Sequence, residues 1–190
     1  MHYSRVEEKA LRKTAALHDG QHRKGDLLPT LSHVVAVALL LTDYTDDEDI
    51  IASALLHDTV EDTMYNFEEL ENDFGPKICD IVRGVTITDE DGSPKNWKER
   101  HLFYIETLEM ARMESAYVAA ADKIHNIRSM ILWYKGADDN EFHHDFGGTN
   151  RERSEMYKKI REIIGNKINN SRLLEEYDKA LEEYTEFLSR

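Results

Sequence analysis

Apolar residues recur along nearly the whole chain at the three- and four-residue spacing that is typical of amphipathic α-helices. This pattern predicts a protein built of helices, and we therefore expect an all-α fold class. The segment 31–41 is strongly apolar and is expected to lie centrally. The predicted helices cover 5–18, 31–41, from about 46 through 58, 67–74, from 76 onward, 94–110, 115–133, 155–164 and 173–188.

Residues suited to helix ends mark several of these boundaries. Asn66 and Glu69 have the spacing of a capping box, in which each side chain accepts a hydrogen bond from the other residue's backbone N–H. Gly75 is suited to end that helix, and Pro76 is suited to the first turn of the next one.

Two further helix starts and one loop complete the outline. Asp46 or its neighbour Thr45 can cap the helix that follows them. Ser93-Pro94 has the same kind of start signal before the helix that ends near 110. Residues 136–150 are rich in Gly and Asp and are typical of a mobile loop.

The chain has 190 residues, which is enough for one domain with a substantial core. No internal repeat and no low-complexity linker divides it. We expect a single domain over 1–190, with the candidate functional motifs in a core of about 5–135, a loop at 136–150 and C-terminal helices at 151–190.

Composition narrows the function classes. The net charge of −14, from 24 Lys and Arg against 38 Asp and Glu, argues against nucleic-acid binding, which needs a broad basic surface. A local basic cluster could still hold a small anionic substrate. No apolar run approaches the length of a membrane span, so no membrane partner is expected. Cys79 is the single cysteine, which predicts a reducing, cytoplasmic location; the oligomeric state stays open.

The segment 54–63 is the most distinctive in its chemistry, because an apolar run leads directly into His57, Asp58, Glu61 and Asp62. Such groups are costly to bury unless a cation meets them. In a continuous helix, His57 and Glu61 would share one face, and Asp58 and Asp62 the neighbouring face. A divalent cation is the simplest partner for that arrangement.

Two distant segments could supply further ligands. Asp122 and Asn126 lie one helical turn apart, and the alanines at 119–121 would let their helix approach another closely. His33 stands at the start of the apolar helix and could point into the same centre. With the histidine-aspartate pair, this makes two imidazoles and two carboxylates, a set that suits Mn, Fe, Co or Zn better than Ca or Mg.

The order of these motifs resembles that of the HD-domain metal phosphohydrolases, an all-helical superfamily, and more narrowly the hydrolase domain of RelA/SpoT-type alarmone enzymes. The similarity covers roughly the first two-thirds of the chain. No synthetase or regulatory domain is recognisable, so the resemblance is closest to the stand-alone small alarmone hydrolases. The matching motifs are HDGQHRK at 18–24 with Pro29 and His33, LLHDTVEDT at 55–63, Phe74-Gly75, VRGVT at 82–86 and ADKIHN at 121–126.

This resemblance implies an HD-domain helical bundle and a manganese-dependent hydrolase. Its expected reaction removes pyrophosphate from the 3′ position of ppGpp or pppGpp and leaves GDP or GTP. Glu61 and Asp62 match an acidic pair next to the metal, and we expect Glu61, with help from Asp62, to orient or deprotonate the attacking water. The metal ligands that the resemblance implies are His33, His57, Asp58 and Asp122.

The same resemblance implies a nucleotide-binding set. The family's Arg-Lys pair falls on Arg23 and Lys24; a guanidinium can stack on a purine or grip phosphate, and Lys supplies a point charge. Asn126 matches a position expected to contact the nucleoside. A substrate this anionic needs more cations, and the start of a predicted helix offers three of them, Lys95, Lys98 and Arg100.

Four positions depart from the family pattern. Thr30 stands where the family has Tyr, and Val34 where it has Pro; Ile87 and Ala119 stand where Lys is common. These changes remove no expected metal ligand but take an aromatic surface and up to two cations from the expected nucleotide site. Two alternatives therefore stay open: an HD phosphohydrolase acting on another nucleotide, such as a nucleoside monophosphate or a dNTP, or a non-catalytic nucleotide-binding HD module.

One further cluster, His143-His144-Asp145, has the residue types of a second metal site. Its Gly- and Asp-rich context favours an exposed segment or a lid over the pocket.

Overall fold

The expected helical pattern is present throughout the described parts of the chain, residues 4–23, 28–87, 96–134 and 147–189 of this computed structural model. Within these ranges no strand forms, and an isolated antiparallel bridge joins His22 to Pro29. The all-α prediction is confirmed. The helices are α1 (Arg5–Leu17), α2 (Leu31–Leu41), α3 (Glu48–Leu56), α4 (Thr59–Asp62), α5 (Phe67–Phe74), α6 (Pro76–Arg83), α7 (Trp97–Met110), α8 (Met113–Trp133), α10 (Asn150–Lys167) and α11 (Ser171–Leu188).

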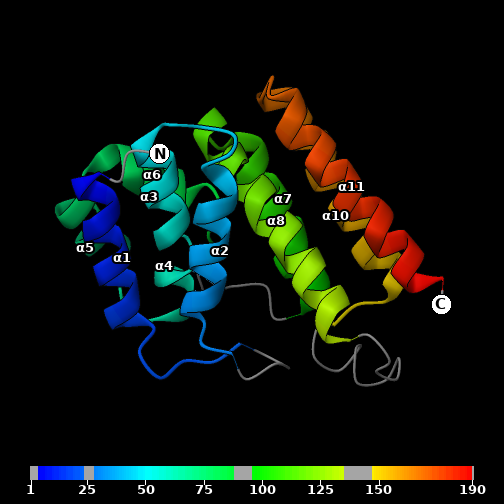
Figure 1. Ribbon diagram of the computed structural model, residues 1–190, viewed down its shortest axis with the longest axis horizontal. Helices are drawn as coiled ribbons and strands as arrows, with labels where there is room; N and C mark the ends of the chain where they lie inside the picture. Colours follow the sequence, from blue (N-terminus) through cyan, green and yellow to red (C-terminus); the bar gives the residue numbers. More distant parts are fainter. Residues whose placement is uncertain (1–3, 24–27, 88–95, 135–146, 190) are drawn as a thin grey trace.

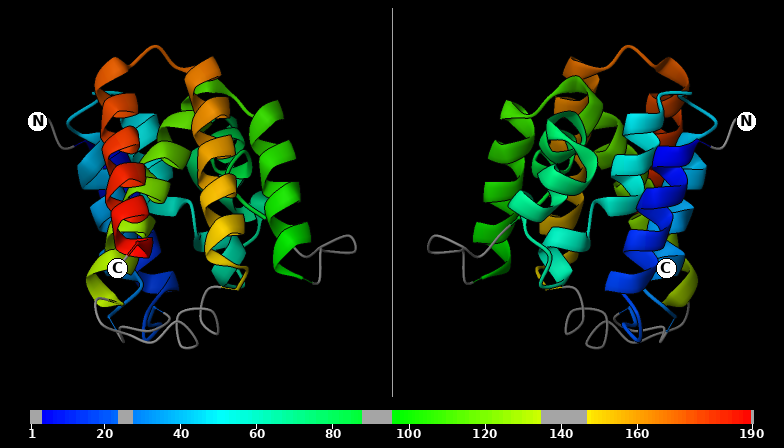
Figure 2. Two further views of the ribbon diagram at one scale, coloured as in Figure 1. Left: turned by 90° about the vertical axis from the view of Figure 1, so that its right-hand side faces the viewer. Right: turned by 90° about the vertical axis from the view of Figure 1, so that its left-hand side faces the viewer.

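Helices α3 and α8 form the centre of the molecule. Helix α3 packs against α1, α2, α6 and α8, and α8 also packs against α10 and α11. Figure 1 shows α8 running between the α1–α3 group and the α10–α11 pair, and Figure 2 shows the same layers from both sides. Every residue of Ile50–Leu56 is buried. The fully buried alanines at 119–121 give α8 a thin face against its neighbours, as the sequence predicts.

Helix α2 is less central than its apolar sequence predicts. It packs against α3 and α8, and Val34, Val37 and Leu41 are fully buried. Leu39 on its other side is 56% exposed, so one face of α2 meets solvent. Among the described residues, no helix has the combination of length and apolar character that crossing a membrane requires.

The capping signals around α5 are confirmed. The Asn66 side chain accepts a hydrogen bond from Glu69 N at 3.0 Å, and the Glu69 carboxylate accepts one from Asn66 N at 3.1 Å. Gly75 ends α5 at a φ of +84°, a conformation that suits glycine, and Pro76 opens α6.

Two predicted helix starts are wrong by a few residues. Helix α3 is capped by Asp47 rather than Asp46 or Thr45; the Asp47 carboxylate accepts from Asp49 N at 2.9 Å. The Thr45 hydroxyl accepts instead from Asp47 N at 3.1 Å, which holds the turn that precedes the cap. Neighbouring Asp and Thr residues can all cap, and only the backbone geometry selects one of them.

Helix α7 begins at Trp97, three residues after the position that Ser93-Pro94 indicates; those two residues lie outside the described ranges. Its N-cap is Asn96, which forms a capping box with Glu99. This start signal is as clear in the sequence as the one at Asn66.

The prediction of one continuous helix through His57-Asp58 is wrong. Helix α3 ends at Leu56, and α4 begins at Thr59. The Thr59 hydroxyl donates to the Leu56 carbonyl at 2.6 Å, and Nδ1 of His57 bonds the Ala54 carbonyl at 2.7 Å. These side chains occupy carbonyls that a continuing helix would use, so the chain turns here. The shared faces that a continuous helix would give the histidine and the carboxylates therefore do not exist.

The C-terminal helices begin earlier than predicted. Helix α8 starts at 113 rather than 115, α10 at 150 rather than 155, and α11 at 171 rather than 173. The first turn of α10 is polar and carries no apolar periodicity, but Thr149 and Glu152 cap it reciprocally. Most of the expected 136–150 loop, including His143-His144-Asp145, lies outside the described residues.

One continuous apolar cluster extends through the described helices, from Ala10 in α1 to Tyr184 in α11. The α10–α11 pair buries its apolar face against α8 and belongs to this core. The single domain over 1–190 stays a prediction, which the shared core supports.

Candidate metal centre and adjoining cavity

Four polar side chains from three places in the chain meet beside the core. His33 comes from the first turn of α2, His57 and Asp58 from the α3–α4 junction, and Asp122 from the middle of α8. Candidate ligand atoms of His33, His57 and Asp58 lie within 4.8 Å of one another.

The spacing inside this group suits a single ion. Nε2 of His33 lies 3.2 Å from Oδ1 of Asp122 and 3.4 Å from Oδ2 of Asp58. Nε2 of His57 lies 3.1 Å from Oδ1 of Asp58 and 3.7 Å from Oδ1 of Asp122. Ligand atoms held about 2.1 Å from a common ion are separated by roughly 3.0–3.5 Å, so these distances are of the right size.

Both imidazoles are oriented with Nε2 towards the centre. Nδ1 of His57 donates to the Ala54 carbonyl, which leaves the Nε2 lone pair facing inwards. This Nε2 atom is buried and has no hydrogen-bond partner. Nδ1 of His33 lies 2.8 Å from Nδ1 of His125. Hydrogen bonds of this kind to the second ring nitrogen are typical of metal-binding histidines.

The charge balance favours a cation at this point. Burial alone would lower the pKa of His57, but Asp58 and Asp122 raise it to about 9. Burial would raise the pKa of the Asp122 carboxyl, but Lys123 and the two imidazoles hold it well below its usual range. The pKa of His33 is lowered, chiefly by burial. The unpartnered Nε2 and the two-His, two-carboxylate donor set fit a divalent transition-metal ion.

The acidic pair of α4 borders this centre. Oε1 of Glu61 accepts from Arg100 at 2.9 Å, and Oε2 accepts from the backbone N–H of Ile87 at 3.1 Å. Burial raises the pKa of Glu61 to about 7; the Ile87 N–H opposes this rise, and Asp58 adds to it. The side chain keeps 28% of its surface exposed, so the carboxylate can reach a ligand. Asp62 is exposed at the edge of the same cavity.

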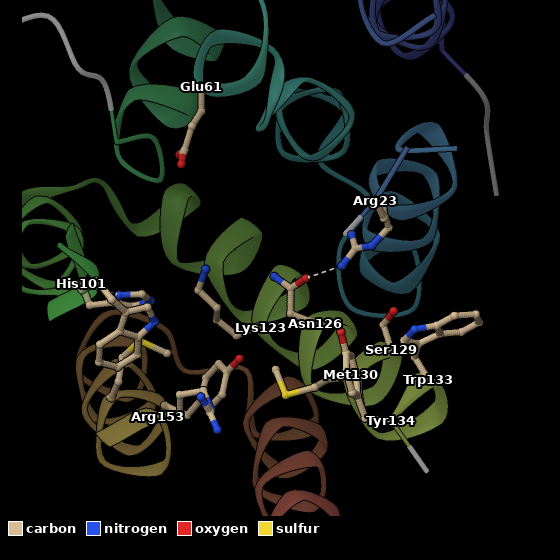
Figure 3. A pocket seen from close by; sticks show the side chains of 13 residues that line it. Arg23, Glu61, His101, Lys123, Asn126, Ser129, Met130, Trp133, Tyr134 and Arg153 are labelled. Carbon is tan, nitrogen blue, oxygen red and sulfur yellow. Dashed lines mark hydrogen bonds between the residues drawn. The ribbon is translucent and has the colours of Figure 1, made fainter. Parts of the chain in front are cut away.

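A cavity of about 580 Å³ opens in front of these groups. A second cavity of about 370 Å³ adjoins it and extends along α8 towards α10. Figure 3 shows Glu61 and Lys123 pointing towards each other from α4 and α8. The two cavities share Arg23, Glu61, His101, Lys123 and Asn126 as lining residues.

The residues predicted to bind the nucleotide fall into three groups by their position in the structure. Arg23 and Asn126 line both cavities and bond each other at 3.0 Å (Figure 3). Nδ2 of Asn126 also donates to Oδ1 of Asp122 at 2.5 Å. Arg100 lines the larger cavity, whereas Lys98 is exposed and lines neither. The remaining two, Lys24 and Lys95, lie outside the described residues.

The four positions that depart from the family pattern fall into two groups, those that line a cavity and those that are buried in the core. Thr30 and Ile87 line the larger cavity, so they change its surface. Val34 and Ala119 are fully buried and belong to the packing of α2 and α8.

Nζ of Lys123 lies 2.6 Å from Oδ2 of Asp122, so this neighbouring residue belongs to the site. Three further residues of the site carry no clear signal in the sequence. His125 is recognised only through its contact with His33, although its place three residues after Asp122 puts it on the same side of α8. Trp97, from the start of α7, and Arg153, from α10, line the smaller cavity far from every motif.

Comparison with known protein families shows which family this chain belongs to. The family model described as HD domain matches residues 10–145, so the chain belongs to the HD-domain family. The resemblance in the motifs is confirmed.

Two relatives are enzymes called guanosine-3′,5′-bis(diphosphate) 3′-pyrophosphohydrolase MESH1. The one from Danio rerio is 38% identical over 112 residues, which are 58% of this chain and 60% of the relative. The one from Drosophila melanogaster is 35% identical over 123 residues, 63% of this chain and 66% of the relative. The matched part of the chain thus spans less than two-thirds of each relative, 60% of the first and 66% of the second.

A solved structure, described as a metazoan ortholog of SpoT that hydrolyzes ppGpp, superimposes over almost the whole chain. The TM-score is 0.78 at 27% identity, covering 96% of this chain and 97% of the other. The correspondence includes α10 and α11, so these helices are a shared part of the fold.

Proposed function

We propose that this protein is a metal-dependent 3′-pyrophosphohydrolase that degrades ppGpp and pppGpp to GDP or GTP and pyrophosphate. The observation that carries this proposal is the buried convergence of two imidazoles and two carboxylates next to Glu61 and a cation-lined cavity. Relatives named for this reaction share the HD domain, and their names direct the choice of substrate.

The proposed metal ligands are His33, His57, Asp58 and Asp122, and the family resemblance suggests manganese. When bound, such an ion supplies Lewis-acid activation of water and of phosphoryl oxygens. The chain's own part is to hold the donor atoms in place: Ala54 and His125 fix the two imidazole rings.

Glu61 is the proposed proton acceptor, with Asp62 beside it. Water attacks the phosphorus that is linked to the ribose 3′ oxygen, a proton of that water passes to Glu61, and the bond from phosphorus to the 3′ oxygen breaks. Glu61 passes this proton to the departing 3′ oxygen, and the products are the nucleotide and pyrophosphate. A carboxyl with a pKa of about 7 is well matched to accepting a proton near neutral pH. Arg100 and the Ile87 N–H hold both carboxylate oxygens in position.

The smaller cavity is proposed to hold the nucleoside. Arg23 at its entrance can stack on a purine or bind phosphate, and Asn126 can hydrogen-bond the nucleoside. The link from Arg23 through Asn126 to Asp122 connects nucleoside binding to the metal centre. Lys24 and Lys95 are also proposed to bind the anionic substrate, and the exposed Lys98 is expected to contribute less to that binding.

The single, buried Cys79 supports a reducing, cytoplasmic location.

A second candidate is an HD phosphohydrolase that acts on another nucleotide. The observation in its favour is that Thr30 and Ile87 line the larger cavity where alarmone hydrolases carry Tyr and Lys. A non-catalytic nucleotide-binding module has less support, because the acidic pair and all four candidate ligands are present.

The test is a substrate panel with manganese-loaded protein: ppGpp, pppGpp, dNTPs, nucleoside monophosphates and cyclic nucleotides. The proposal requires release of pyrophosphate from ppGpp and pppGpp. Activity on monophosphates or dNTPs alone would establish the second candidate instead. Metal-loaded protein that binds nucleotides but turns over none of the panel would be a binding module.

A further inference from the structure

The hydroxyl of Tyr104 is a buried polar group whose proton has no acceptor among the described residues. Tyr104 lies on α7, is 4% exposed, and its Oη atom makes no hydrogen bond with the described residues. Burying an unpaired hydroxyl is destabilising, so native proteins rarely leave one without a reason.

Two other buried tyrosines have hydroxyls with a hydrogen-bond partner. Oη of Tyr177 donates to the Tyr157 carbonyl at 3.1 Å, and Oη of Tyr184 accepts from Nε of Arg153 at 3.2 Å. Both of these rings are fully buried in the core. Tyr104 differs from them because it also lines the larger cavity, together with the candidate metal ligands and Glu61.

Tyr104 shares its cavity with three cationic side chains and with the carboxylates of the candidate site. Nζ of Lys123 lies 4.3 Å from the centre of the Tyr104 ring, and this lysine is held by Asp122 at 2.6 Å. Arg100 and Arg23 line the same cavity. Burial raises the pKa of the phenol to about 12, while Lys123 acts in the opposite direction. The hydroxyl therefore keeps its proton at neutral pH and can act as a donor.

We propose that Tyr104 is a substrate-contacting residue whose hydroxyl donates a hydrogen bond to a phosphoryl oxygen of the bound polyphosphate, beside the ammonium of Lys123. The identity of the ligand as a polyphosphate rests on the proposed function. The unpaired hydroxyl costs stability in the free protein, and the bound anion supplies the acceptor that the fold lacks.

The test compares Tyr104→Phe with wild type, using inorganic pyrophosphate as the probe and calorimetry on metal-loaded protein. A hydrogen bond to a charged acceptor implies that the affinity falls by roughly 10- to 100-fold. The same factor is expected in kcat/KM for ppGpp. The unfolding midpoint should stay the same or rise, because Phe buries the same ring without the unpaired hydroxyl.

Tyr177→Phe is the matched control. It removes a paired hydroxyl outside both cavities, so it should lower the unfolding midpoint and leave pyrophosphate affinity unchanged. Wild-type affinity in Tyr104→Phe would overturn the inference, whether or not its stability falls. A wild-type protein that fails to bind pyrophosphate would overturn it as well.

The two proposals fail in different ways. If wild type turns over no alarmone but Tyr104→Phe weakens pyrophosphate binding, the proposed function is wrong and the phosphoryl contact stands. If wild type hydrolyses ppGpp and Tyr104→Phe binds pyrophosphate and turns over as wild type does, the proposed function stands and the role of Tyr104 is wrong.

Discussion

The candidate metal centre and the outer wall of the cavity are built in different ways. The centre is formed where α2, the α3–α4 junction and α8 pack together, and three of its four candidate ligands are buried. The outer wall comes from α7, the end of α8 and α10, and includes Trp133, which is 51% exposed. Apart from α8, the centre and the outer wall thus come from different helices.

The difference has a physical cause. Buried imidazoles and carboxylates must be paired, protonated or bound to a cation, so a change at one of them affects the whole group. The outer wall combines the exposed Trp133 with buried side chains such as Arg153 and Met130, and none of these is a candidate ligand. Thr30 and Ile87 depart from the family pattern on the surface of the larger cavity, beside the centre, and leave every candidate ligand in place.

The largest effect is expected at the centre. Asp122→Asn keeps the size of the side chain but removes the charge that lies between both imidazoles and Lys123. Changes to groups that only support metal ligands lower metal affinity by about 10- to 100-fold, so loss of a ligand should exceed that range and abolish turnover. Titration calorimetry with Mn²⁺ measures the metal affinity. Asp80→Asn, an exposed carboxylate on α6, is the control; full affinity in Asp122→Asn would remove Asp122 from the ligand set.

Glu61→Gln should come next, with a fall in kcat of about 10²- to 10⁴-fold and unchanged metal content. Because the pKa of Glu61 is raised to about 7, the carboxyl is protonated below that pH and cannot accept a proton. The kcat/KM of wild type should therefore rise as pH increases through about 7 and then level off. Stopped assays across pH 5.5–8.5, a range of roughly three units around that value, would show whether Glu61→Gln loses the rise of kcat/KM with pH. Wild-type turnover in Glu61→Gln would assign proton transfer to another group.

A smaller effect is expected where the two regions meet. Arg23→Lys keeps the charge but loses the planar guanidinium that bonds Asn126, so KM should rise by roughly 3- to 30-fold with little change in kcat. Steady-state kinetics on ppGpp separate the two parameters. A fall in kcat without a change in KM would mean that Arg23 acts on the metal centre through Asn126 rather than on the nucleoside.

The smallest effect is expected for Lys98→Ala. This lysine is exposed and lines neither cavity, in contrast to Arg100 two residues later. Its removal should change kcat/KM by less than about 2-fold, since an isolated surface charge contributes little. A large loss would extend the substrate site along α7.

The sequence predicts residues carried by motifs better than it predicts contacts between distant segments. The motifs predicted the four candidate ligands, and the structure brings these residues together. The helix break at Leu56 was missed, because the Thr59 and His57 side chains compete with the backbone ladder in a way that periodicity does not register. The contact of His125 with His33 joins residues 92 positions apart, and nothing local in the sequence indicates it.

The sequence by itself determined the helical class, most helix boundaries to within a few residues and the residue types of the metal centre, because these depend on local periodicity, capping and motif order. Only the tertiary structure decided that α3 rather than α2 is central, that Glu61 is held by Arg100 and Ile87, and that the hydroxyl of Tyr104 is buried at the cavity without a partner. Burial, pairing and pKa depend on which distant side chains meet, and that information exists only once the chain has packed.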